Sequence, residues 1–158
     1  MSAVHRLATA VWRRLGGRWQ WRVLRWREST FLVGLTGVVI DDDGRVLVQV
    51  HRYWMGNPCG LPSGWAAVGE TWEQGLTREV REETGLTVTD VRVVRVAPVP
   101  AARRGPRIEV LLSGRAPGQA VPRPDGTEVL AAEFVDLAEA RRRLRPEHLQ
   151  LIDLAVTS

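Results

Sequence analysis

The sequence predicts an α+β domain, in which strands and helices follow one another without a regular strand–helix–strand repeat. The chain has 158 residues, of which 44% are hydrophobic, and this is enough for one compact core. Runs rich in β-branched residues flank turns that contain Asp and Gly, which predicts strands. A helix with clear end signals separates the earlier strands from the later ones. Charged residues make up 25%, so a disordered or fibrous chain is excluded.

Residues 1–30 are interpreted as a separate basic extension. Apolar residues at three- and four-residue spacing from Val4 to Leu15 predict a short amphipathic helix, which Gly16 and Gly17 end. The extension has seven arginines and one acid, a net charge of +6, whereas the rest has 15 arginines and 17 acids, a net charge of −2. We favour packing of this segment on the main domain or on a second subunit, as in a homodimer. Contact with a membrane surface or with nucleic acid is the alternative.

Two strands open the main domain. The apolar residues 31–40 and 45–51 predict a hairpin around the turn 41–44, which reads Asp-Asp-Asp-Gly. Glycines and prolines make residues 52–63 a loop, and residues 65–68 are expected to form a small strand.

The next helix has well-defined ends. Thr71 is a suitable N-cap with Gln74 as its capping-box partner, and Gly85 stands where a left-handed C-terminal residue is needed. The remaining elements are expected to be strands at 86–99 and 107–113 joined by a basic turn at 101–106, a loop at 114–127, a strand at 129–135, and helices at 137–145 and 146–156.

Three glutamates lie on one surface of the predicted helix. Glu79, Glu82 and Glu83 are related by three- and four-residue spacing, and a helical wheel places Glu79 and Glu83 beside the apolar stripe of Leu76 and Val80. Carboxylates at such positions are costly unless a cation neutralises them, and clustered oxygen ligands suit Mg²⁺ or Mn²⁺. The alternative is a solvated face on which glutamates and arginines form salt bridges.

The residues before the helix favour the metal interpretation. A loop rich in glycine and proline carries a further acid, Glu70, just ahead of the N-cap. Backbone groups beside a carboxylate cluster suit a diphosphate bridged by a metal ion.

This stretch resembles the Nudix box of the Nudix hydrolases. Residues at every fixed offset of the family pattern are present: Gly64, Glu70, Arg78, Glu79, Val80, Glu82, Glu83, Gly85 and Leu86. The resemblance extends over about residues 31–156. It implies a Nudix α/β/α sandwich with a central mixed β-sheet for residues 31–158, in addition to the basic amphipathic helical extension.

The resemblance also implies a reaction. This is hydrolysis of a diphosphate bond in a nucleoside diphosphate linked to another moiety, with Mg²⁺ or Mn²⁺ as cofactor and a nucleotide-type small molecule as substrate. Glu79, Glu82 and Glu83 would ligate the metal together with a backbone carbonyl near Gly64, so Glu82 and Glu83 take part in catalysis. A further glutamate joins the site in some members, as ligand or general base. Glu128 is the best-placed candidate, and Glu109 is the second choice.

Other positions of the box have structural roles by the same resemblance. Glu70 would pair with Arg78 and fix the loop against the helix, while Gly64 and Gly85 would supply backbone conformations that other residues adopt with difficulty. Ser63 and Ala67 depart from the common pattern, in which a glycine and a glutamate are frequent. Both lie on the loop that faces the metal, and they leave the number of metal ions open.

The substrate candidates lie outside the box. Arg103, Arg104 and Arg107 could grip phosphates, although an exposed basic turn is the simpler interpretation. Trp54, with Tyr53 and Trp65, could stack a base at the mouth of the site, and packing within the core or the loop is the alternative.

A catalytically silent Nudix-fold binding or regulatory module, acting through residues 1–30, is the alternative function. Three mutually repelling glutamates favour the enzyme, because a module without turnover has no need for them. The single cysteine, Cys59, and the absence of an uncharged run of membrane-spanning length predict a cytoplasmic protein.

Overall fold

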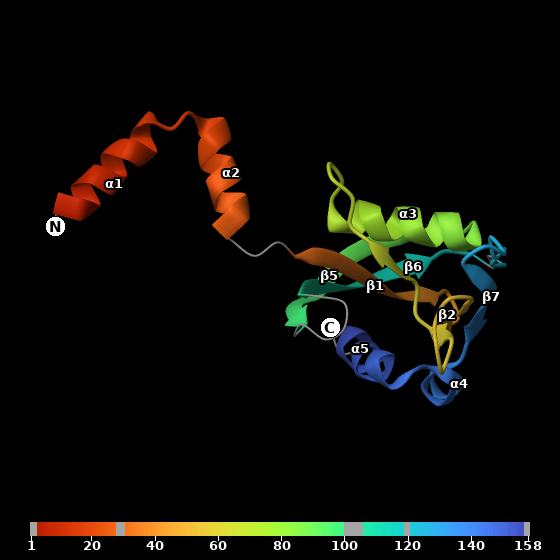
Figure 1. The fold of residues 1–158 in the computed structure, drawn as a ribbon. Coiled ribbons are helices and arrows are strands. Elements are labelled where there is room, and N and C mark those ends of the chain that lie inside the picture. Colours follow the sequence, from red (N-terminus) through yellow and green to blue (C-terminus); the bar gives the residue numbers. More distant parts are fainter. Residues whose placement is uncertain (1–2, 28–30, 100–105, 119–120, 157–158) are drawn as a thin grey trace. The chain divides into compact units, whose positions relative to one another are not determined.

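The computed structural model describes residues 3–27, 31–99, 106–118 and 121–156 (Figure 1). The chain divides into two compact units, Met1–Phe31 and Leu32–Ser158, and each is described by itself.

The first unit consists of two helices. α1 spans Ala3–Arg14, which confirms the predicted amphipathic helix, and α2 spans Gly17–Arg27. The side-chain N–H of Gln20 donates to the carbonyl of Trp12 at 2.7 Å and ties the two helices together. Among the described residues, no helix is both long enough and apolar enough to cross a membrane.

The second unit is built on a mixed sheet of seven strands within the described residues. The strands are β1 (Leu32–Asp41), β2 (Val46–His51), β3 (Cys59–Gly60), β4 (Ser63–Trp65), β5 (Thr89–Val99), β6 (Arg107–Ala116) and β7 (Val129–Val135). Their order is β3-β2-β1-β6-β5, with β4 paired to β1 and β7 paired to β2. The β1–β6 pair is parallel and the other pairs are antiparallel. The predicted mixed sheet is therefore confirmed.

The sheet lies between two helical layers. Figure 1 shows α3 (Trp72–Thr84) on one face and α4 (Leu137–Arg143) with α5 (Pro146–Val156) on the other. β1 is buried along most of its length. Its alternate residues therefore pack in two hydrophobic cores, one on each face of the sheet. Leu35 and Val39 pack in the core that contains Leu76 and Val80 of α3, whereas Val38 packs in the core that holds residues of α4 and α5. This is the expected α/β/α sandwich.

Several boundaries differ from the sequence prediction. The small strand is Ser63–Trp65 and not residues 65–68, because Glu70 accepts the N–H of Ala67 at 2.8 Å and turns the chain away from β1. The predicted loop at 52–63 contains the short strand β3, which pairs with β2 between two prolines. β6 continues to Ala116 because its parallel pairing with β1 continues to Asp41.

Candidate active site

The helix α3 has the caps that the sequence predicts. The Thr71 hydroxyl accepts the N–H of Gln74 at 3.2 Å, and the Gln74 side chain accepts the N–H of Thr71 at 2.9 Å. Gly85 follows the helix with φ of 70°, in the left-handed region that favours glycine. These caps fix where the helix begins and ends, and therefore which side chains face the sheet.

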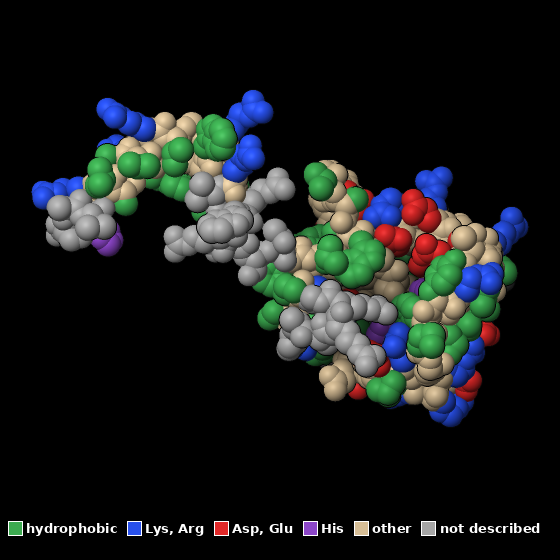
Figure 2. Space-filling model, in the orientation of Figure 1, with side chains coloured by type: hydrophobic (Ala, Val, Ile, Leu, Met, Phe, Trp, Pro, Cys, Tyr) green, Lys and Arg blue, Asp and Glu red, His purple; other side chains and the backbone are tan. Residues whose placement is uncertain are grey.

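Three of the four glutamates of α3, those of the predicted metal set, differ in burial as the helical wheel predicts. Glu83 is buried, with 6% of its surface exposed. The Glu79 side chain is 17% exposed and that of Glu82 is 62% exposed. The helix thus places the Glu83 carboxylate in the protein interior, that of Glu79 near the surface and that of Glu82 in solvent. In Figure 2, acidic side chains gather over α3 with arginines beside them.

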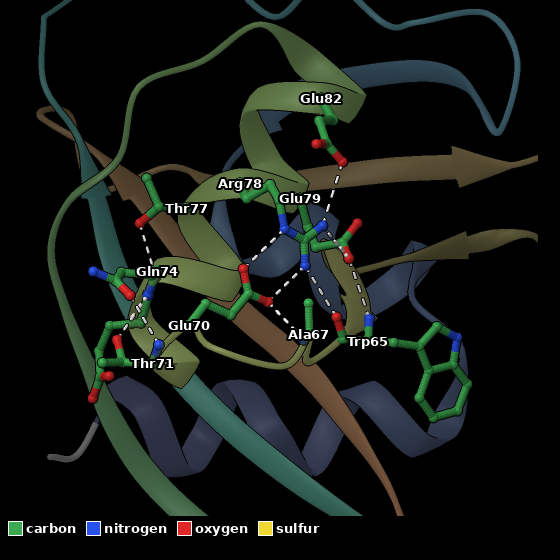
Figure 3. A network of polar contacts seen from close by, with 10 residues as sticks. Trp65, Ala67, Glu70, Thr71, Gln74, Thr77, Arg78, Glu79 and Glu82 are labelled. Carbon is green, nitrogen blue, oxygen red and sulfur yellow. Dashed lines mark hydrogen bonds and ion pairs between the residues drawn. The ribbon is translucent and has the colours of Figure 1, made fainter.

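Arg78 holds the preceding loop against the helix (Figure 3). Its Nε donates to Glu70 Oε2 at 3.0 Å and its Nη2 donates to Glu70 Oε1 at 2.8 Å, so the expected ion pair is bidentate. Nη2 also donates to the carbonyl of Trp65 at 3.1 Å. The hydrogen bonds from Arg78, and then the one from the Ala67 N–H, lower the pKa of Glu70 to about 2. The loop is therefore locked by an acid that stays ionised.

The same guanidinium also contacts two of the helix carboxylates. Arg78 Nη1 donates to Glu79 Oε1 at 2.9 Å and to Glu82 Oε2 at 3.4 Å. Glu79 Oε1 also accepts the backbone N–H of Trp65 at 3.2 Å. Glu79 and Glu82 thus share one cationic group at the rim of the site, as Figure 3 shows.

Gly64 is required for space, which corrects the expectation that it supplies an unusual backbone conformation. It is not among the glycines with positive φ, whereas Gly85 is. A Cβ added to Gly64 would lie 2.1 Å from the Cδ of Glu79. Because β4 runs so close to α3, only a residue without a side chain leaves room for the Glu79 carboxylate.

The buried carboxylate of Glu83 lies in an acidic environment. The side-chain N–H of Gln49, on β2, donates to Glu83 Oε2 at 3.1 Å, and no ion pair to Glu83 occurs among the described residues. Burial raises the pKa of Glu83 to about 8, and the charges of Glu79, Glu128 and Asp125 act in the same direction. Gln49 Oε1 is buried without a hydrogen-bond partner. This pocket therefore favours a bound cation.

The loop before β7 supplies the two further acids near Glu83. The Asp125 N–H donates to the Glu83 carbonyl at 3.0 Å, and the Asp125 carboxylate accepts the N–H groups of Glu128 and Val129. Glu128 is thus held close enough for its charge to raise the pKa of Glu83. Glu109 instead accepts the Thr36 hydroxyl at 2.6 Å and is not among the groups that shift this pKa. The effect of the Glu128 charge on Glu83 favours Glu128 over Glu109 as the additional acid, and this choice stays a prediction.

The donor set has the chemistry of a divalent-cation site. Within the described ranges, no three His, Cys, Asp or Glu side chains stand ready to hold a metal ion. Glu79 and Glu82 are instead held by Arg78 Nη1, and Glu83 has an amide as its partner. Mg²⁺ and Mn²⁺ prefer carboxylate oxygens as ligands. Here such oxygens lie near Glu83, whose buried charge has no cationic partner among the described residues. The residues therefore fit the expected metal.

A cleft of about 400 Å³ begins at Gly64 and extends along the sheet face that carries α5. The register of β6, β1 and β4 aligns Glu109 with Gly34 and Gly34 with Trp65, so Glu109 and Trp65 line the same cleft. Arg107 also lines it and donates to Glu109 at 3.3 Å. Trp65 is 48% exposed. The cleft thus has an exposed aromatic ring and a partly buried carboxylate in its lining, and its lining residue Gly64 lies against Glu79.

Trp54 packs within the fold and also lines this cleft, so its role as a base-stacking residue stays a prediction. Its ring stacks on His51 with 3.7 Å between ring centroids, and the Arg145 guanidinium lies over it at 4.6 Å. The indole is therefore packed against an imidazole and a guanidinium. His148 makes an edge contact with the same ring. Tyr53 is 66% exposed. Arg103 and Arg104 lie outside the described residues.

Some residues near the site were not predicted from the sequence. Gln49 alternates with valines on β2, a pattern that suggests a solvent-facing side chain, yet it is fully buried. Asp125 belongs to an Asp-Gly turn, which predicts a turn but not proximity to Glu83. His148 joins His51 and Trp54 from a distant segment, so no local signal could have indicated this three-residue cluster.

Sequence comparisons match less than half of this chain to curated proteins. The chain is 36% identical over 66 residues to the NAD-capped RNA hydrolase NudC of Mycobacterium bovis, which covers 42% of this chain and 21% of that protein. It is 41% identical over 64 residues to an isopentenyl-diphosphate Delta-isomerase of Mycolicibacterium vanbaalenii, covering 35% and 33% of the two chains. The match thus spans a third or less of the length of these curated relatives.

Structural comparisons and the family model cover more of the chain. The NUDIX domain of Shewanella oneidensis NrtR, solved with ADP ribose, is similar over 99% of this chain and 98% of its own, with a TM-score of 0.71 and 20% identity. A NUDIX hydrolase from Nitrosomonas europaea covers 81% and 90%, with a TM-score of 0.68 and 22% identity. Both have the same fold. The family model of the NUDIX domain matches residues 30–155, and the chain therefore belongs to the Nudix hydrolase family.

Proposed function

We propose that this protein hydrolyses a diphosphate bond in a nucleoside diphosphate linked to another moiety, with Mg²⁺ or Mn²⁺ as cofactor. The observation that carries the proposal is Glu83, a buried carboxylate surrounded by acids and without a cationic partner among the described residues. A site of this kind stabilises a bound cation, and the cation would in turn neutralise the negative charge of a diphosphate.

Each side chain has a distinct proposed role. Glu79, Glu82 and Glu83, with a backbone carbonyl near Gly64, would hold the divalent cation, which supplies charge neutralisation and activates water. Glu128 is the proposed general base, since the loop places its charge near Glu83 while its side chain stays exposed. Arg78 and Glu70 are positioning residues, because they hold the loop that contains Gly64.

The cleft is the proposed site for the rest of the substrate. Gly64 lines the cleft and lies beside Glu79, which supports placing there the part of the substrate that extends from a diphosphate at the glutamates. Trp65 has an exposed ring on which a base could stack. Arg107 also lines the cleft and is the residue proposed to contact a phosphate or hydroxyl group of the substrate. ADP-ribose and NAD are the first compounds to test, because the names of similar proteins include ADP ribose and NAD-capped RNA.

Turnover of a substrate panel tests this function. Release of phosphate or nucleotide would be measured from ADP-ribose, NAD, NAD-capped RNA, dinucleoside polyphosphates and nucleoside triphosphates, with Mg²⁺, Mn²⁺ or a chelator. Isopentenyl diphosphate is included because one similar protein is named as its isomerase. We expect cleavage of at least one nucleoside diphosphate derivative that needs the metal and stops with the chelator.

A different result would support the binding-module alternative. A folded protein that binds metal and one of the nucleotides, but releases no product from any compound, would contradict the hydrolase. A homodimer and the cytoplasmic location remain predictions, which sedimentation and cell fractionation would test.

A further inference from the structure

The apolar stripe of α1 is uncovered within its own unit. Leu7 is 68% exposed, Val11 is 54% exposed and Trp12 is 37% exposed. These residues, together with Ala8 and Leu15, fall on one side of the helix at three- and four-residue spacing. Large apolar side chains gathered on one helix face indicate a surface that binds something apolar.

The charge around this stripe has a single sign. Residues 1–27 contain seven arginines and no acid. On the helical wheel, Arg6 and Arg13 lie on the side of α1 away from the stripe, and Arg14 lies at its edge. α2 adds Trp19 and Trp21, which are 58% and 68% exposed. Figure 2 shows apolar patches along this unit and arginine side chains projecting from it.

We propose that the α1–α2 unit binds the surface of an anionic lipid bilayer, with α1 lying in the plane of the interface. The stripe of Leu7, Val11 and Trp12 would enter the boundary between headgroups and acyl chains, and the arginines would contact the anionic headgroups. Tryptophan suits this boundary because its ring is apolar and its N–H is polar. This inference rests on residues outside the glutamate site and does not depend on the proposed hydrolysis.

Two other occupants fit the observations less well. Stacking on nucleic acid requires aromatic rings and arginines to face the same ligand, whereas α1 separates its apolar stripe from Arg6 and Arg13. A symmetric contact between two copies of this unit would bring 14 arginines together without one acid from residues 1–27. An anionic bilayer complements both the charge and the stripe.

Vesicle flotation with the full-length protein tests the proposal. Vesicles of phosphatidylcholine with about 30% phosphatidylglycerol would be compared with pure phosphatidylcholine vesicles. We expect binding to the anionic vesicles to be at least about tenfold tighter, and to weaken between about 50 and 300 mM NaCl because salt screens the arginines.

Variants separate the stripe from the charge. Leu7→Gln with Val11→Gln keeps the charge and is expected to weaken vesicle binding by about tenfold or more. The control is Thr9→Gln with Ala10→Gln, on exposed positions outside the stripe, which should bind like the wild type. Hydrolytic turnover in solution and the unfolding midpoint should be the same in both double variants.

Three results would overturn the proposal. The first is equal flotation of the wild type and the stripe variant, or no flotation with anionic vesicles. The second is binding to a single-stranded oligonucleotide that is tighter than vesicle binding and insensitive to the stripe variant. The third is an absence of vesicle binding by the wild type together with a structural effect of the stripe variant. Loss of a dimer would assign the stripe to a contact with a second copy. A lower unfolding midpoint of the Nudix domain would assign it to a contact with this chain's own domain.

Discussion

Glu83 is the residue at which burial and charge conflict most strongly. It is 6% exposed, its hydrogen-bond partner is an amide, and three neighbouring acids act with burial to raise its pKa. Such a carboxylate costs stability while it is ionised and metal-free, and it favours a bound cation for the same reason. We therefore expect Glu83 to lower the stability of the metal-free protein and to favour metal binding.

The stability of Glu83→Gln tests this conflict. Without metal at pH 8, we expect the variant to have a free energy of unfolding about 2 kcal/mol higher than the wild type, because a buried charge is removed. The new amide can also donate to Gln49 Oε1, which has no partner. Urea unfolding with a chelator and with excess Mg²⁺ measures the effect. Mg²⁺ should stabilise the wild type more than the variant, and a less stable variant without metal would contradict this account.

Gly64 gives a second prediction at the residue scale. In Gly64→Ala, the new Cβ would collide with Glu79 Cδ, so Glu79 has to move and turnover should fall by about tenfold or more. The fold should change little, because the φ of Gly64 is not positive. Gly37→Ala is the contrasting control, since its Cβ would meet the core residue Leu76 and should lower stability. Wild-type turnover in Gly64→Ala would contradict the assigned position of Glu79.

At the scale of elements, the site depends on how α3 begins and on what holds the preceding loop. The capping box fixes the first turn, and Arg78, in the second turn, joins the helix to Glu70 and to the carbonyl of Trp65. Glu79 and Glu82 share the guanidinium that holds the loop. We therefore expect a change in the loop to shift the positions of these two carboxylates. The loop and the helix therefore act as one unit.

The capping box can be tested by itself. Thr71→Ala removes the hydroxyl that accepts the Gln74 N–H and should lower the free energy of unfolding by about 1 kcal/mol. Thr71→Ser keeps the hydroxyl and should recover most of the loss. Urea denaturation of the three proteins measures the difference. Equal stability of Thr71→Ala and wild type would show that the cap contributes nothing here.

Local signals explain which elements could be predicted from the sequence. Thr71, Gln74 and Gly85 specify the ends of α3 through their near neighbours, so the helix and the burial order of its glutamates follow from the sequence. Gln49 and the short strands β3 and β4 depend on partners distant in the chain. The proposed metal ligands were indicated by the family pattern, whereas the Arg78 contacts to Glu79 and Glu82 required the structure.

At the scale of the whole domain, the layer of α5 is joined to the sheet through buried histidines. His148 Nδ1 accepts the backbone N–H of Leu61 at 2.9 Å, and His51 stacks on Trp54. Burial lowers the pKa of His148 and that of His51 to about 4 in each case. Both side chains are therefore neutral in the folded protein at neutral pH, and acid should loosen this contact.

The pH dependence of stability follows from the sign of these shifts. The pKa of His148 is about 4 when folded and 6.5 in the reference state, so the unfolded chain binds the proton first as the pH falls. Stability from His148 is complete above about pH 6.5 and is lost toward pH 4. Glu83 acts in the opposite direction, because its raised pKa makes the folded state bind a proton below about pH 8.

His148→Gln separates the two contributions, since its amide oxygen can still accept the Leu61 N–H. Between about pH 6.5 and 4.5, the loss of unfolding free energy with falling pH should be smaller in the variant by about 1.4 kcal/mol per pH unit, corresponding to one proton. Urea unfolding of both proteins in chelator across this range measures the slopes. Identical slopes would show that His148 is not held neutral by the fold.

The most direct test of the proposed active site compares two glutamates of one helix. The measurement is the rate of diphosphate cleavage at increasing Mg²⁺ for the wild type, Glu83→Gln and the control Glu73→Gln, which changes a glutamate in the first turn of α3 outside the metal set. We predict that Glu83→Gln loses about a thousandfold or more of the rate at saturating Mg²⁺, while Glu73→Gln stays near the wild type. Metal-dependent cleavage by Glu83→Gln at the wild-type rate would contradict the assignment of the acidic site on α3 as the catalytic centre.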